Sequence, residues 1–341
     1  MANAITSMTT YTGKQSEFRE LVMKKLQGFL SLNELGFQII EDIQSNKIMY
    51  KDAYMDKITR KRVSCNNTVT GNGVAISSFT LAVTDMQAQL EQCADVFDAT
   101  IAEVLRKRGA DINDLTGTEI ETYILERVAD AAARDIFRIV LLGDTTLTNA
   151  DYTAFDGVFK KVKAGFLASD GTVRVAASIS DSDLTAANLV ATLDAYVTAQ
   201  PDELKFMPDE SKRFFVTDSV YRAYERYLSS TQFSGVAEQR NALVNGIPSL
   251  TFRGIPVVNL KVISKYLLQD FNTTSPQSSS VVDNRILLTV PENHYIATDT
   301  LTDTAKVQMW YEPVEDQNYT RLRYKLGYNY AFGELNVYGG W

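Results

Sequence analysis

The residues of this chain with reactive side chains are few. His294, in the stretch PENHYIA, is the only histidine of the 341 residues, and Cys65 and Cys93 are the only cysteines. A nucleophile activated by a histidine would have to be built around His294, yet the chain contains no G-x-S-x-G elbow. Phosphate-loop, G-x-G-x-x-G and H-E-x-x-H motifs are absent as well. The sequence therefore predicts no catalytic residue and no cofactor, and His294 is expected in a loop or at the end of a strand.

The stretch LLGDTTLTNADYTAFDG contains three aspartates. Asp144, Asp151 and Asp156 could gather around a divalent cation, because hard cations bind carboxylate oxygens. Their spacing is not that of an EF-hand, and turn and capping roles are the more common use of such aspartates. We therefore expect no metal site.

The two cysteines, Cys65 and Cys93, lack the spacing of a zinc site and are too few for a disulfide framework. This predicts buried free thiols in a reducing compartment.

Composition limits the class of protein. A chain of 341 residues with 45 % hydrophobic residues can bury the core of one large domain or two ordinary ones. The net charge of −8 argues against a general nucleic-acid binder, so any contact with DNA is expected to be local and weak. No apolar run reaches the length of a membrane span and the N-terminus has no signal-peptide core, so we expect a soluble protein made in the cytoplasm, with no membrane partner.

The first third of the chain predicts an arm, a helix and a basic hairpin. Residues 1–15 are polar and without period, and residues 16–40 carry apolar side chains at helical spacing. Residues 44–65 are strongly basic, and a turn at Gly71–Gly73 followed by a β-rich run indicates a long hairpin. Such one-sided charge in an acidic chain favours contact with an acidic surface. The basic residues of its tip are Lys57, Arg60, Lys61 and Arg62.

Two long amphipathic helices are predicted next. Residues 84–108 place apolar side chains on one stripe and end in Arg-Lys-Arg-Gly. Residues 118–142 begin with a capping box, Thr118 with Glu121, and would extend about 37 Å at ~1.5 Å per residue. The second helix is expected to be the backbone of the architecture.

The remainder predicts a mixed α/β region followed by antiparallel strands. A short helix is expected after Phe155-Asp156-Gly157, a strand and helix in residues 213–228, and a hairpin turning at Arg253-Gly254. The last long strand, residues 319–332, alternates aromatic and basic side chains. Its basic face consists of Arg321, Arg323 and Lys325. A short return strand is expected over residues 334–338.

This order of elements resembles the major capsid protein of tailed bacteriophages, the Hong Kong 97-type fold. The resemblance is carried by the long helix TGTEIETYILERVADAAARDIFRIVLLGD with the following AFDGVFKKV, and by RFFVTDSVYRAYERYL with TFRGIPVVNL. It covers roughly residues 45–341. It implies an α+β fold with an N-terminal arm (1–44), an extended β-hairpin loop (45–83), a peripheral domain with a long spine helix (84–186 and 291–341) and an axial domain (187–290).

The resemblance also implies a function and partners. Copies of the chain would form the hexamers and pentamers of an icosahedral shell around double-stranded DNA, with separate scaffold, portal and decoration proteins as further partners, and the shell would assemble in the bacterial host cytoplasm. The basic hairpin would then lie on acidic residues of a neighbour's spine helix. The candidates are Glu119, Glu121, Glu126 and Asp130. Two alternatives stay open, which are an encapsulin-like nanocompartment shell and an unrecognised soluble enzyme using His294 with nearby carboxylates.

Overall fold

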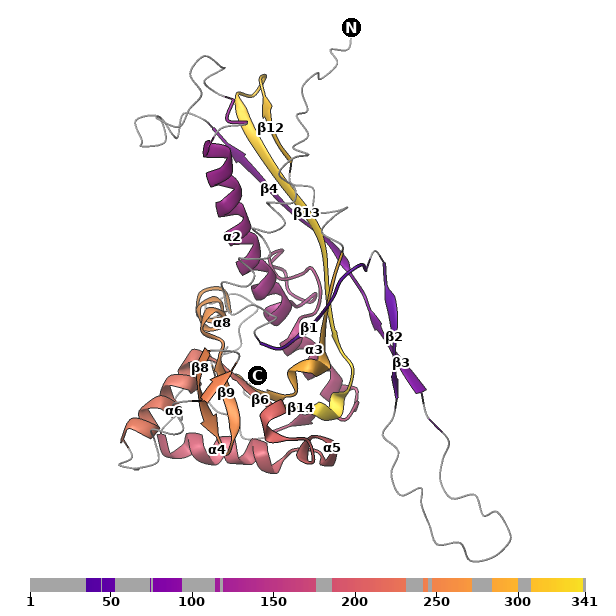
Figure 1. Ribbon diagram of the computed structural model, residues 1–341, viewed down its shortest axis with the longest axis vertical. Coiled ribbons are helices and arrows are strands. Elements are labelled where there is room, and N and C mark those ends of the chain that lie inside the picture. Colours follow the sequence, from indigo (N-terminus) through magenta and orange to yellow (C-terminus); the bar gives the residue numbers. More distant parts are fainter. Residues whose placement is uncertain are drawn as a thin grey trace, which may run out of the picture.

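The computed structural model describes eleven stretches of the chain, and our description is confined to them. They are residues 35–43, 45–52, 74, 76–93, 114–116, 119–175, 186–230, 242–244, 247–271, 284–299 and 308–339. The predictions for the arm over residues 1–15, for most of the helix over 16–40 and for the basic tip of the hairpin lie outside these residues. The molecule is elongated, with a long helix and strands at one end, a compact α/β part at the other, and a hairpin projecting beside it (Figure 1).

The elongated part is a five-stranded sheet beside helix α2 (Glu119–Leu142), which confirms the predicted spine helix. Its central strand is β13 (Gln317–Tyr330). One edge of β13 pairs with β4 (Thr84–Gln92), and the other pairs with β12 (Gln308–Glu312) and β11 (His294–Thr298) in turn. Strand β1 (Gln38–Ile40) extends the sheet beyond β11 by parallel pairing.

Two helix predictions are wrong where the structure describes them. Residues 84–92, expected as the start of a helix, form β4, and residues 38–40, expected at the end of another, form β1. In β4 the apolar residues Met86, Ala88 and Leu90 alternate with polar ones, so one face suits a strand, while the spacing to Cys93 also suits a helix. The ladder of hydrogen bonds offered by β13 decides in favour of the strand.

The compact part is a seven-stranded sheet. Its strand order is β5 (Val173–Arg174), β14 (Asn336–Gly339), β10 (Ile286–Thr289), β6 (Arg213–Val216), β9 (Ile255–Asn259), β8 (Ile247–Phe252) and β7 (Ala242–Val244). The predicted strand β6, the predicted hairpin β8–β9 and the short return strand β14 are confirmed. The hairpin turns at Arg253 and Gly254, whose φ angles are +50° and +84°, as the tight two-residue turn requires.

Helices cover both faces of the seven-stranded sheet. Successive residues of β6 point to opposite faces, so Phe214 packs with α4 (Ala186–Thr198) and α6 (Asp218–Ser230), while Phe215 packs with α2 and α3 (Val158–Leu167). The helices α5 (Asp202–Lys205) and α8 (Lys261–Tyr266) complete the described α-helices. The core around α2 and α3 also takes in Leu326 and Tyr328 of β13, so it joins the two sheets.

The AFDG passage brings the end of α2 against the start of α3. The Gly143 amide donates to the carbonyl of Ile139 at 2.8 Å, and the Gly157 amide donates to the carbonyl of Gly143 at 2.8 Å. A Cβ atom on Gly157 would lie 2.6 Å from the carbonyl oxygen of Val140. The two glycines are therefore required by close approach of backbone to backbone.

The hairpin is confirmed at its base, where β2 (Lys47–Asp52) pairs with β3 (Ile76–Leu81). Its inner face contacts the body, because the ring of Phe79 lies 5.5 Å from that of Tyr295 and the Lys51 ammonium donates to the carbonyl of Ala331.

Candidate assembly surfaces

His294 is at the start of β11, inside the protein, with no exposed surface. Its Nε2 is 2.9 Å from the hydroxyl of Thr289, and its Nδ1 is 2.6 Å from the hydroxyl of Tyr328. Thr289 donates its own proton to Oδ1 of Asn336 at 2.7 Å, so it accepts from Nε2–H, and Nδ1 accepts from Tyr328. We call these four residues the His294 junction.

The junction suits a neutral imidazole and no catalytic role. Burial lowers the pKa of His294 to about 3, because the charged form would lose its hydration. The four residues come from β10, β11, β13 and β14, so the junction connects the two sheets. The expected position at a strand end is confirmed, and the imidazole is closed to any substrate in this structure.

The aspartates after α2 act in turns. Oδ1 of Asp156 accepts from the amide and the hydroxyl of Thr145, both at 2.9 Å. Asp144 accepts in the same way from Thr146 and pairs with Lys160 at 3.1 Å. Burial alone would raise the pKa of Asp144, but these hydrogen bonds and the lysine outweigh it and lower the pKa. Asp151 is exposed, and within the described part of the chain no group of histidine, cysteine or acidic residues could hold a metal ion.

The outer face of the hairpin base exposes three large apolar side chains to solvent. Pairing places Ile48, Tyr50 and Ile76 on the same face, and they are 57 %, 74 % and 69 % exposed. A row of large apolar side chains in water is unfavourable unless another surface covers it. The alternation of Ile48 with Tyr50 is the signal in the sequence that predicts this face.

The structure describes the acidic side of the predicted charge contact, on α2. Lys57, Arg60, Lys61 and Arg62 lie outside the described residues, as does the side chain of Glu119. On α2, Glu121 is only 2 % exposed, whereas Glu126 and Asp130 are half-buried. The acidic row therefore offers a neighbour mainly Glu126 and Asp130, because the carboxylate of Glu121 is directed into the protein.

The predicted basic face of β13 consists of side chains from this one strand only. Arg323 is exposed, Lys325 lies 3.9 Å from Asp85 of β4, and Arg321 donates to Gln308 of β12 at 2.5 Å. The guanidinium of Arg321 lies 5.4 Å from the ring of Trp310, which is stacked on Tyr319 at 5.5 Å. The opposite face of the strand is buried at Leu322, Leu326 and Tyr328, so the predicted alternation is confirmed.

Comparison with known proteins identifies the fold of this chain through solved structures, and not through its sequence. No family model and no curated protein matches the sequence. A chain from the procapsid of satellite phage P4, whose structure includes the size determination protein, superposes with a TM-score of 0.53 at 10 % identity, over 94 % of this chain and 98 % of that one. A chain of Gordonia phage Cozz superposes with a TM-score of 0.50 at 10 % identity, over 90 % and 85 %. The chain has the α+β fold of phage capsid structures, the Hong Kong 97-type fold that the sequence predicts.

Proposed function

We propose that the chain is the major capsid protein of a tailed bacteriophage and assembles into an icosahedral shell that encloses double-stranded DNA. The observation that carries this proposal is the match in fold over nearly the full length of both chains to a procapsid protein. A shared fold at 10 % identity does not transfer function by itself, so the proposal also needs surfaces suited to self-association.

The hairpin base supports self-association. Its inner face is fixed to the body, while Ile48, Tyr50 and Ile76 on the outer face are uncovered. A second copy is the natural cover, because a closed shell presents the same neighbouring surface to every projecting hairpin. Many such modest contacts add up to a stable shell.

The charge distribution supports a container whose wall binds DNA weakly. With a net charge of −8, the chain offers basic side chains to DNA only locally, as at Arg321, Arg323 and Lys325. We infer that scaffold, portal and decoration proteins take part in assembly in the host cytoplasm, as the resemblance implies.

The division into an arm, an extended loop, a peripheral domain and an axial domain is part of the proposal. Strands β5 and β14 pair within the seven-stranded sheet. In our proposal they therefore belong to the axial sheet, although the expected boundaries put residues 84–186 and 291–341 in the peripheral domain.

None of the described helices is long and apolar enough to cross a membrane.

The test is electron microscopy of the purified chain, alone and with the product of a neighbouring scaffold gene. We expect closed shells or capsomers, and a shell that protects double-stranded DNA in infected cells would distinguish a phage capsid from a nanocompartment with an enzyme inside. The variant Tyr50→Asp should reduce particle yield, whereas Ser77→Asp, on the opposite face of the same hairpin, should not. A chain that stays monomeric or dimeric at high concentration in both preparations would refute the proposal.

A further inference from the structure

The turn after α4 forms an acidic corner with an aromatic tip. Phe206, directly after α5, is 85 % exposed. Three exposed carboxylates surround it in sequence, those of Asp202, Glu203 and Glu210, and among the described residues none of the three has an ion-pair partner. We call residues 202–211 the Phe206 corner.

The corner is fixed in shape by a buried lysine. The side chain of Lys212 is 2 % exposed, and its ammonium lies 2.8 Å from Oδ1 of Asp209, 3.2 Å from Oε1 of Gln200 and 3.5 Å from the carbonyl of Lys205. These acceptors span both sides of the turn, so one cation ties its two ends together. A rigid projection loses less conformational entropy on binding than a flexible one.

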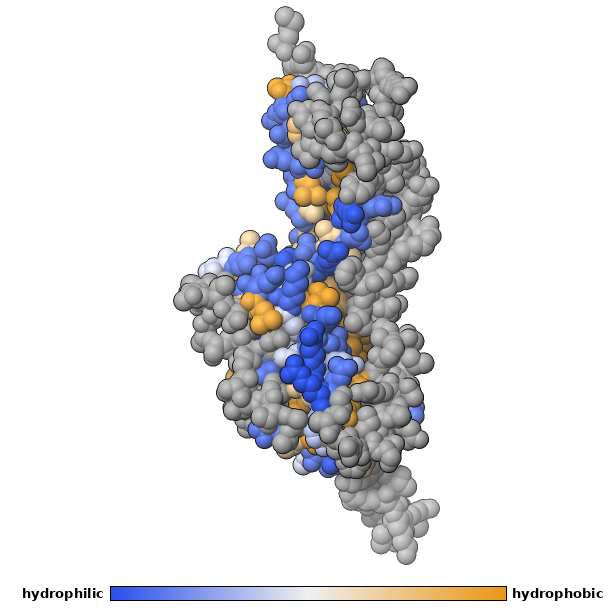
Figure 2. All heavy atoms as spheres, turned by 90° about the vertical axis from the view of Figure 1, so that its left-hand side faces the viewer, coloured by the Kyte–Doolittle hydropathy of each residue, from blue (hydrophilic) through white to orange (hydrophobic). Residues whose placement is uncertain are grey.

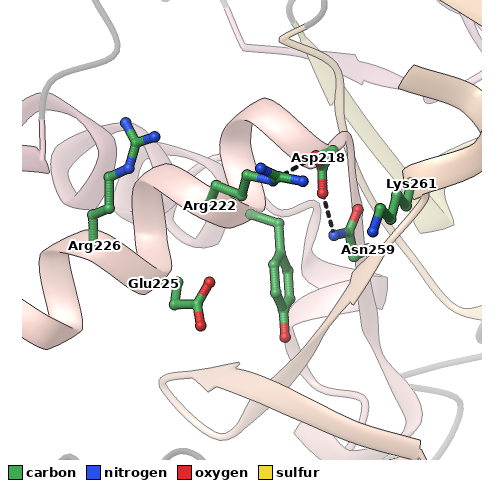
Figure 3. Close-up of a pocket in the computed structure, with 7 residues that line it drawn as sticks. Asp218, Arg222, Glu225, Arg226, Asn259 and Lys261 are labelled. Atoms are coloured by element: carbon green, nitrogen blue, oxygen red, sulfur yellow. Dashed lines mark hydrogen bonds and ion pairs between the residues drawn. The ribbon is translucent and has the colours of Figure 1, made fainter. Parts of the chain in front are cut away.

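A cationic hollow lies on α6. Its volume is about 400 Å³, and it is lined by Asp218, Tyr221, Arg222, Glu225, Arg226, Asn259 and Lys261. The carboxylate of Asp218 is already engaged, because Nε of Arg222 lies 2.6 Å away and Nδ2 of Asn259 donates to it at 2.9 Å (Figure 3). Arg226 and Lys261 are exposed, and neither has an ion-pair partner within the described part of the chain. The lining therefore holds three cations, Arg222, Arg226 and Lys261, against the two carboxylates of Asp218 and Glu225, which leaves one net positive charge.

The two features lie on opposite sides of the compact part, with α6 on the left of Figure 1 and α5 on the right. On the left-hand face, which is turned toward the viewer in Figure 2, strongly hydrophilic residues lie in the middle of the lower half, with hydrophobic residues beside them. A corner on one side and a complementary hollow on the other suit head-to-tail contact, which closes into a ring when each copy is rotated by a fixed angle.

We propose that the Phe206 corner of one copy docks into the α6 hollow of the next copy around each capsomer. The proposal rests on the proposed shell function and names the residues of one contact within it. The carboxylate of Glu203 pairs with Lys261 and that of Glu210 with Arg226, and the ring of Phe206 enters the hollow between them. Opposite charges at the two sides also prevent corner from meeting corner, which fixes the order of subunits.

The first test is cross-linking between copies. One preparation carries Phe206→Cys and another Lys261→Cys, both in a chain with Cys65→Ser and Cys93→Ser, and the two are co-assembled and treated with a short bismaleimide. We expect cross-linked dimers at about tenfold the yield of a control mixture in which Lys163→Cys, exposed on α3, replaces Lys261→Cys. Each single-cysteine preparation alone should give only the control yield, because the contact is head-to-tail.

The second test exchanges the charges. Lys261→Glu should lower particle yield on the order of tenfold, and Glu203→Lys in the same chain should restore it to within about twofold. Lys265→Glu, one turn along from Lys261, is the matched control. Shells of wild-type protein with cross-linking at the control yield would overturn the docking contact and leave the proposed function intact. A wild-type chain that forms neither shells nor capsomers would refute both.

Discussion

Acid is expected to destabilise the folded chain through His294. The imidazole has no exposed surface, and burial lowers its pKa from 6.5 to about 3. Between these two values the unfolded chain binds a proton that the folded chain does not, so the free energy of unfolding decreases as the pH falls. The effect is absent above pH 7, where both states are neutral at this position.

The size of the effect follows from the two pKa values. Each pH unit below 6.5 removes about 1.4 kcal/mol until the folded-state pKa is reached. Lowering the pH from 7 to 5 should therefore decrease the free energy of unfolding by about 2 kcal/mol through this one residue. Protonation would also require Nδ1 to donate, where it now accepts from Tyr328.

The measurement is urea unfolding of the unassembled chain at pH 7.0 and pH 5.0, for the wild type and for His294→Gln. The amide of glutamine can still donate toward Thr289, and it does not titrate. We expect the variant to be less stable at pH 7 by about 1 to 3 kcal/mol, and to lose about 2 kcal/mol less than the wild type on acidification. Other groups, such as Asp135, whose pKa is raised by burial, are common to both proteins and cancel in the difference.

Two results would refute this reasoning. One is an equal loss of stability on acidification in the wild type and the variant. The other comes from magnetic resonance, because His294 is the only histidine of the chain and its ring protons can be assigned without ambiguity. A titration near pH 6.5 in the folded protein would mean that the imidazole is hydrated.

Three further predictions concern the backbone and the basic face. Gly157→Ala should cost about 3 kcal/mol or prevent folding, since its Cβ would contact backbone oxygen rather than a flexible side chain, and thermal unfolding measures it. Asn293→Ala should cost about 2 to 3 kcal/mol in urea unfolding, because its amide makes two backbone hydrogen bonds of 2.8 Å with Phe332; an unchanged midpoint would contradict this. Replacing Arg321, Arg323 and Lys325 by glutamine should leave particle yield unchanged at low salt and alter only its salt dependence, whereas loss of assembly at all salt concentrations would show a structural contact.

Much of the fold could be predicted from sequence because the patterns were long and unambiguous. Helix α2 shows apolar residues at helical spacing over 24 residues, and β13 alternates polar and apolar residues from Arg321 to Tyr330. The AFDG passage also predicted α3, and the structure supplies the reason for the glycine. In each case the local pattern and the tertiary contacts favour the same conformation.

The errors arose where the pattern was short or where the partner decided the outcome. Strand β4 satisfies a helical period and a strand period at once, and only pairing with β13 distinguishes them. The Phe206 corner and the α6 hollow were missed for a different reason. Their residues are distant in sequence, and neither the buried state of Lys212 nor the engagement of Asp218 by Arg222 and Asn259 leaves a periodic signal.

The segment Ala331–Phe332 connects the three main parts of the molecule. Strand β13 of the first sheet ends just before it, and β14 of the second begins just after it. The hairpin reaches the same segment, because Lys51 of β2 donates to the carbonyl of Ala331 and lies 5.2 Å from the ring of Phe332. Asn293 makes two hydrogen bonds with Phe332, and Asn336 of the His294 junction donates to the carbonyl of Phe332 at 3.2 Å. In the proposed shell, a neighbouring copy that binds the hairpin would therefore act on the connection between the two sheets, and weakening the His294 junction by acid should alter how the hairpin, and not only the core, is held.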